Sequence, residues 1–189
     1  HGYLEKTNDQ INRYVNARGI EWTNKKSILV GISETVIYSG YNRSFDIGYL
    51  NPISSHLEIE LNNRLNVEGT KSSNAVWQIH LDCLFREKIR MSINYLFDEF
   101  VLDPEIEIGK EHGRANSLRL SYTLIDKKNN YLNLYGKNIF VGTPTFRHGF
   151  GENNFVQNSA PIGFRNGSDL EEVLVGLNYS NKSSLIFNL

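Results

Sequence analysis

The chain has 189 residues, of which 20 are basic and 21 acidic, for a formal net charge of −1. This balance offers no electrostatic basis for binding nucleic acid, so we predict that nucleic acid is not a partner. The single cysteine excludes an internal disulfide and a zinc site built on cysteines. No apolar run is long enough for a transmembrane helix, but a transmembrane β-strand needs only ~9 to 11 residues.

The first half of the chain alternates apolar and polar residues, a pattern that predicts β-strands. Strands are expected over 13–22 and 27–38, joined by a charged turn at 23–26. In the second of these, alternate residues from Ile28 to Tyr38 share an apolar face that Glu34 interrupts. The long link that follows contains Pro52 after Asn51, which predicts a short helix over 52–62.

A central hairpin over 75–97 has the clearest alternation in the chain. Trp77, Ile79 and Leu81 lie on one face of its first strand, and Ile93 and Tyr95 follow the same pattern on its second. The intervening positions are mostly polar. The turn is expected at 86–88, so the hairpin has one apolar and one polar face.

Further strands are predicted over 116–124, 131–139 and 170–179, with an eighth beginning at 184. Short charged turns alternate strictly with long links along the chain. We therefore predict an all-β, antiparallel, up-and-down meander of about eight strands, with the long links at one end and the tight turns at the other. This arrangement is typical of outer-membrane barrels.

Two other classes of protein fit the same alternation. The apolar rows of a soluble sandwich or lipocalin-like β-domain would enclose a core or an apolar ligand. An outer-membrane channel for small solutes would share the barrel but keep an open lumen. We expect residues 1–189 to form a single partial barrel domain within a longer chain, since the sequence starts at His1 without an initiator methionine.

The polar rows supply the first set of candidate site residues. In a barrel these side chains would line the lumen and position sugar hydroxyls or ions; the alternative is charge pairing that keeps a polar interior satisfied. The predicted lumen residues are Arg18, Glu21, Glu34, His80, Asp82, Arg90, Asn94 and Asp98.

The long link over 140–169 supplies the second set. It interleaves phenylalanines with amide and guanidinium side chains, which suits polyhydroxylated sugars. The predicted ligand-binding residues are Arg147, Asn153, Asn154, Phe155 and Gln157. The alternative is a link that folds over the end of the barrel and packs its own aromatic rings.

The chain has no recognisable catalytic or metal-binding motif. Its histidines lack the spacing of a zinc site, no serine lies in a Gly-x-Ser-x-Gly turn, and no phosphate-binding loop is present. We therefore predict a protein that is not an enzyme and that has no metal and no cofactor.

Several runs of residues, in their order and spacing, resemble the capsule-assembly Wzi-like family as it occurs in Bacteroidetes. The runs are 18–22, 31–40, 49–52, 73–75, 96–100, 153–155, 160–163 and 167–171. In order and approximate spacing the resemblance extends over most of the chain, and the ordered set carries it because none of these runs is specific alone.

This resemblance implies the C-terminal portion of a bacterial outer-membrane β-barrel associated with surface polysaccharide. The expected partners are that polysaccharide and the lipid of the outer membrane. Family members have more strands than the eight predicted here, and some relatives are linked to gliding motility. The resemblance therefore leaves open the oligomeric state and the choice between a capsule role and a motility role.

Overall fold

The structure is a computed structural model that describes residues 2–6, 10–55, 73–99, 111–149, 151–181 and 185–188. It is all-β: a nine-stranded antiparallel sheet whose strands follow one another in chain order. The strands are β1 (Gly2–Lys6), β2 (Ile11–Thr23), β3 (Ile28–Tyr41), β4 (Ser73–Phe85), β5 (Ile89–Glu99), β6 (Gly113–Lys127), β7 (Asn130–Val141), β10 (Leu170–Asn181) and β11 (Leu185–Asn188). The predicted antiparallel meander is confirmed.

The described sheet is open, and β1 and β11 form its two edges. The sequence did not predict β1, because Glu5 and Lys6 give its short run a polar character. Nevertheless β1 pairs with β2, and the register shifts between Tyr3 and Glu5. Short, irregular and charged strands are a common form of sheet edge.

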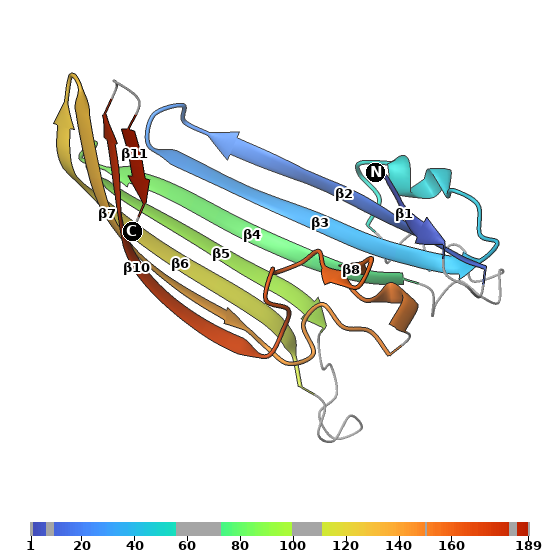
Figure 1. The fold of residues 1–189 in the computed structure, drawn as a ribbon. Coiled ribbons are helices and arrows are strands. Elements are labelled where there is room, and N and C mark those ends of the chain that lie inside the picture. Colours follow the sequence, from blue (N-terminus) through green and yellow to red (C-terminus); the bar gives the residue numbers. More distant parts are fainter. Residues whose placement is uncertain are drawn as a thin grey trace.

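From β2 to β11 the connections between strands have the predicted arrangement (Figure 1): tight turns lie at one end of the sheet and long links at the other. In the β2–β3 turn, the Asn24 side-chain oxygen accepts hydrogen bonds from the backbone N–H groups of Lys26, Ser27 and Ile28 at 2.9, 2.8 and 3.0 Å. In the β4–β5 turn, Arg86 and Glu87 have φ of 47° and 60°, the left-handed pair of a type I′ hairpin.

The helix predicted over 52–62 is wrong in its described part. A single 3₁₀ turn, η1, lies earlier at Ile47–Leu50, where the Asp46 side chain accepts from the Gly48 N–H. Asn51 uses its side chain to accept from the Ile53 N–H at 3.1 Å, which is an Asx turn and not the start of a helix. Residues 56–62 lie outside the described residues.

The strand register gives the sheet two chemically different faces. The polar face carries Glu21 on β2, His80 on β4 and Asn94 on β5, together with every second residue along these strands. The apolar face carries the alternate residues, and one cross-strand row runs through Trp22, Val30, Leu81, Ile93 and Leu118.

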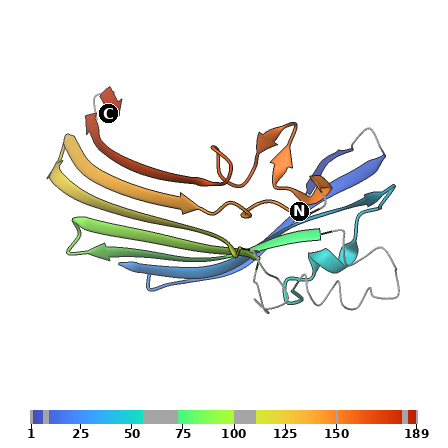
Figure 2. The same ribbon diagram turned by 90° about the horizontal axis from the view of Figure 1, so that it is seen from below.

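Where the long links lie, both faces of the sheet are covered (Figure 2). On the apolar face, residues 43–55 bring Tyr49 onto a cluster of Tyr14, Val36, Tyr38 and Ala75. The ring centroids of Tyr38 and Tyr49 lie 4.3 Å apart in a stacked arrangement. On the polar face, residues 142–169 bring Phe155 onto Ile37 and Val76, with Leu4, Val15, Leu96 and Phe146 packed around them.

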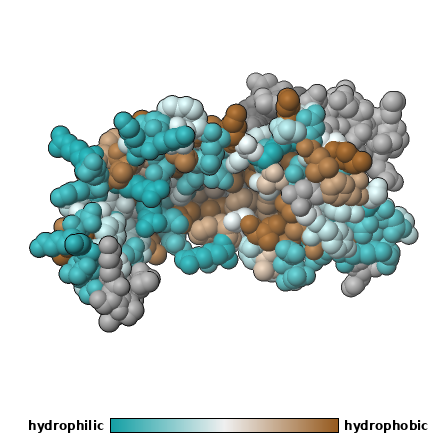
Figure 3. Space-filling view, turned by 90° about the horizontal axis from the view of Figure 1, so that it is seen from above, coloured by the Kyte–Doolittle hydropathy of each residue, from teal (hydrophilic) through white to brown (hydrophobic). Residues whose placement is uncertain are grey.

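Over the rest of the sheet the apolar face has no covering layer among the described residues. Ile32 is 49% exposed, and Val173 and Val175 are each 72% exposed. Hydrophilic residues gather at the end with the tight turns, whereas hydrophobic residues gather towards the middle of the view in Figure 3. Within the described ranges, no helix has the length and apolar character needed to cross a membrane.

Candidate functional site

The link from Gly142 to Asp169 folds back onto the polar face at one end of the sheet (Figure 1). It contains a short 3₁₀ turn, η4 (Gly151–Asn153), and a two-stranded hairpin of β8 (Val156–Gln157) and β9 (Ala160–Pro161). Asn158 and Ser159 form the hairpin turn with φ of 48° and 65°. The link is therefore ordered by its own turns as well as by the sheet beneath it.

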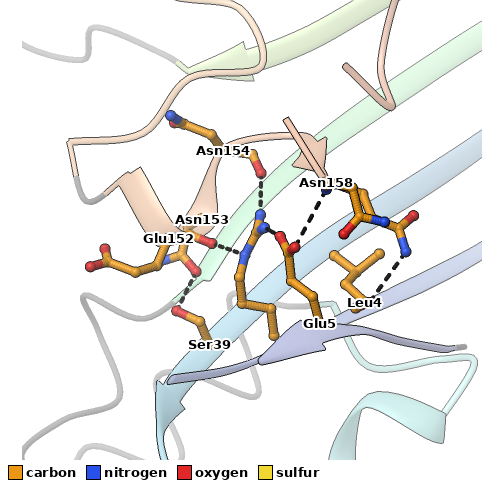
Figure 4. A network of polar contacts seen from close by, with 9 residues as sticks. Leu4, Glu5, Ser39, Glu152, Asn153, Asn154 and Asn158 are labelled. Atoms are coloured by element: carbon orange, nitrogen blue, oxygen red, sulfur yellow. Dashed lines mark hydrogen bonds and ion pairs between the residues drawn. The ribbon is translucent and has the colours of Figure 1, made fainter. Parts of the chain in front are cut away.

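Arg13 on β2 anchors this link, and its side chain is almost fully buried. The guanidinium donates to the backbone carbonyl oxygens of Glu152 and Asn154, the latter at 2.7 Å, and pairs with the Glu5 carboxylate. Figure 4 shows Glu5 and the Glu152–Asn154 segment in this network. One buried cation thus joins β1, β2 and the link, and charge-assisted bonds of this kind are among the stronger ones.

Other polar residues of the sheet hold the link in the same place. The Ser39 hydroxyl donates to the Asn153 side-chain oxygen at 2.8 Å, and Asn74 donates to the Asn153 carbonyl at 3.3 Å. The Asp98 carboxylate accepts from the Phe146 N–H. Asp98, predicted as lumen lining, therefore serves to hold the link.

The five residues predicted to bind ligand mostly make internal contacts. Asn153 is 1% exposed and Phe155 is 4% exposed, so neither side chain is accessible. Asn154 accepts from the His148 N–H at 2.7 Å, and Gln157 donates to the Leu4 carbonyl at 3.2 Å. Arg147 is exposed and contributes a carbonyl to Asn74. These contacts fit the alternative, in which the link folds over the end of the sheet and packs there, better than they fit a ligand-binding site.

The predicted lumen residues Glu21, His80, Asp82, Arg90 and Asn94 share the polar face and pair there. His80 Nε2 lies 2.9 Å from Glu21 Oε1, and both side chains meet over Gly31. A Cβ at Gly31 would lie 2.4 Å from His80 Cε1, so the glycine makes this contact possible. Arg90 Nε donates to both Asp82 oxygens at 2.8 and 2.9 Å.

Asn94 belongs to a polar row that crosses three strands. It accepts from Gln78 Nε2 at 2.9 Å and donates to Ser117 Oγ at 3.1 Å. The row thus satisfies both ends of the Asn94 amide on the polar face.

Arg18 and Glu34 do not join this set. They face each other across β2 and β3 on the apolar face, where they form an ion pair, and Arg18 Nη1 donates to the Asn51 carbonyl at 2.9 Å. The structure therefore corrects the prediction that Arg18 and Glu34 lie on the same face as Glu21. Side chains alternate between the two faces of a strand. Arg18 lies an odd number of residues from Glu21 on the same strand, and Glu34 lies in the apolar row.

Two adjoining hollows open on the polar face beside the link. The first, of about 250 Å³, lies between Phe146 and Phe164 of the link and the Gln78, Asn94 and Ser117 side chains of the sheet. The second, of about 400 Å³, is lined by Arg119, Lys137, Phe164, Arg165 and Glu172. Lys137 and Phe164 line both hollows.

The roles of Arg13, Arg119 and Lys137 were not predicted from the sequence. A single arginine in a strand gives no sign that it will be buried under a distant link. The pairing of Arg119 with Lys137 depends on a bulge between Thr123 and Ile125 that shifts the β6–β7 register. Without a bulge, a hairpin that pairs Lys127 with Asn130 would place Arg119 opposite Asn138.

The fold and the site define an antiparallel β-meander with an uncovered apolar face and a hydrogen-bonded, hollowed polar face. Comparison with known proteins returned no matching family model, no similar curated protein and no similar solved structure. Among the described residues, no group of His, Cys, Asp and Glu side chains is arranged to hold a metal ion.

Proposed function

We propose that this chain is part of a non-enzymatic outer-membrane β-barrel that associates with surface polysaccharide, with its apolar face in contact with lipid. The exposed apolar face carries the proposal. Large hydrophobic side chains stay exposed on consecutive strands, among them Ile20, Ile32, Ile79, Leu118 and Val175. A patch of this extent is unusual on a soluble protein and marks a surface that meets another apolar phase.

The dimensions and the opposite face fit the same proposal. The β2 strand has 13 residues, β3 has 14 and β7 has 12, each enough to cross a hydrocarbon core. The polar face would line the lumen, which is polar in outer-membrane barrels, and there Glu21–His80, Asp82–Arg90 and Gln78–Asn94 pair side chains of neighbouring strands. The proposal also requires that β1 and β11 pair with further strands, because open edges are not tolerated in lipid.

The association with polysaccharide rests on the resemblance to the Wzi-like family and on the polar hollows beside the link. Surface polysaccharide would meet the end of the barrel that carries the long links, since long loops of outer-membrane barrels are extracellular. The soluble alternative needs a protein layer or an apolar ligand over the apolar face. The described residues cover that face only at the end with the long links.

Tryptophan fluorescence tests which phase touches the apolar face. The chain's two tryptophans, Trp22 and Trp77, both lie on that face. In vesicles of brominated phosphatidylcholine, we expect the full-length protein to lose emission relative to unbrominated vesicles, and Trp22→Phe and Trp77→Phe variants to lose part of that quenching. Recovery of the protein as a soluble monomer, or quenching that neither variant reduces, would refute lipid contact.

A pair of adjacent substitutions in β5 provides the matched control. Ile93→Arg places a charge on the apolar face, and Asn94→Arg places the same charge on the polar face. A lipid-facing charge near the bilayer midplane costs ~2–4 kcal/mol, so Ile93→Arg should reduce heat-modifiable, membrane-inserted protein while Asn94→Arg inserts. Equal insertion of both variants would contradict the proposed orientation.

A further inference from the structure

Two cations face each other directly on the polar face. Arg119 on β6 pairs in register with Lys137 on β7, and like charges directly opposite one another destabilise an antiparallel pair. The Arg119 guanidinium lies over the Tyr135 ring, 4.7 Å from its centroid. Among the described residues neither cation forms an ion pair with a carboxylate. In the described part of the chain, the two positive charges thus lie together without a paired carboxylate.

Two carboxylates of the polar face that lie near this pair are bound by other side chains. Asp82 lies in the same cross-strand row but is bound by Arg90 and by Ser92, the latter at 2.6 Å. Glu172 lines the second hollow with the two cations, yet it accepts from Arg165 at 3.4 Å and from Asn166 at 3.1 Å. The hollow therefore has three cationic side chains and one carboxylate, an arrangement that attracts an anion.

The surroundings indicate what carries that anion. Lys137 also lines the neighbouring hollow, together with the aromatic side chains of Phe146 and Phe164. An aromatic ring packs on the apolar face of a sugar. A bare inorganic anion would use the two cations and leave these rings unused.

We infer that Arg119 and Lys137 form the anchor for a carboxylate-bearing sugar residue, whose ring lies against Phe164 in the adjoining hollow. The inference rests on the proposed function and makes it more specific, because it assigns the polysaccharide an acidic character and places its contact on the β6–β7 hairpin. Arg119 and Lys137 would bind the carboxylate, and Phe164 would hold the ring.

Binding of a defined oligosaccharide tests the inference. The probe is trigalacturonate, and its fully methyl-esterified form is the matched neutral ligand; both are titrated into the full-length protein in lipid nanodiscs. We expect trigalacturonate to bind at least about tenfold more tightly than its methyl ester, as charge-assisted contacts allow. Its affinity should fall as the salt concentration is raised. Inorganic phosphate should compete weakly; competition equal to that of trigalacturonate would overturn the role of the sugar ring.

The matched variants are R119Q/K137Q and K127Q/K128Q. Each removes two positive charges from the β6–β7 hairpin, the first from the polar face and the second from the turn. We expect only R119Q/K137Q to lose the tenfold preference, with heat-modifiable migration unchanged in both. Loss of the preference in both variants, or in neither, would overturn the assignment. If the wild-type protein does not insert into membranes, the proposed function fails; if it inserts but binds both trimers equally, only the acidic-sugar site fails.

Discussion

Strand β3 passes through two environments, and the difference between them shows what stabilises this chain. At the end with the long links, Val36, Ile37 and Tyr38 are consecutive and are 1%, 0% and 0% exposed. Further along the same strand Ile28, Val30 and Ile32 are 40%, 38% and 49% exposed. Consecutive buried residues require cover on both faces of a sheet, and among the described residues the links supply it.

The contrast divides the sheet into two regions. We call the part covered by residues 43–55 and 142–169 the packed end, and the part that these links leave uncovered the bare sheet. In the packed end, side-chain contacts and buried polar bonds join the sheet to residues 43–55 and 142–169. In the bare sheet, the strand ladders, the tight turns and the pairs of the polar face are the main contacts, and the described residues leave the apolar face exposed. Stability in water should therefore reside mostly in the packed end.

Two isoleucines of β3 give the largest expected contrast. Ile37→Ala removes a fully buried side chain beneath Phe155 and should lower the free energy of unfolding by about 2–5 kcal/mol. Ile32→Ala, the same change at a half-exposed position, should cost under about 1 kcal/mol. Denaturant unfolding of both variants in detergent measures the difference, and equal losses would contradict the division into two regions.

The Arg13 network is expected to give the next largest effect. Arg13→Met keeps much of the side-chain volume but removes the ion pair with Glu5 and the hydrogen bonds to the Glu152 and Asn154 carbonyl oxygens, and loss of a buried ion-pair partner costs roughly 3 kcal/mol. We expect faster proteolysis within 146–162, because the link loses its anchor. Arg165→Met, at an exposed arginine, should leave the cleavage rate unchanged. Unchanged cleavage in Arg13→Met would show that packing alone holds the link.

The turn at the far end of the sheet should give the smallest effect. Asn24→Ala removes the oxygen that accepts three backbone N–H groups, all exposed, so we expect a loss of about 1 kcal/mol. Lys26→Ala in the same turn is the control and should be neutral. A loss as large as that of Ile37→Ala would show that the turns, and not the packed end, dominate stability.

Much of the sheet could be predicted from the sequence because its signals are local. The period of two marked the strands from β2 to β10, and the charged turns marked where the chain reverses. The same period placed Ile93 and Asn94 on opposite faces, and it placed His80 and Asp82 beside Asn94. The β1 strand was missed because its few residues carry a weak pattern, and the predicted helix was wrong in its described part, 52–55, because Asn51 bonds locally to Ile53.

The candidate site was harder to predict because its contacts are distant in the chain. Asn153 and Phe155 were predicted to bind a ligand, because the sequence alone does not show whether an amide or a ring faces solvent or the sheet beneath it. Arg18 and Glu34 read as lumen residues by their polarity, yet they pair on the apolar face. The face of a strand on which a side chain lies depends on its odd or even position along the strand, and not on its polarity.

By itself the sequence determined an antiparallel meander with an apolar and a polar face, because alternation and turn chemistry act over a few residues. Only the tertiary structure decided which residues are buried by the long links, since the contacts of Arg13 with residues 152–154 join segments more than a hundred residues apart. It also decided that Arg119 faces Lys137, because one bulge changes every cross-strand partner beyond it.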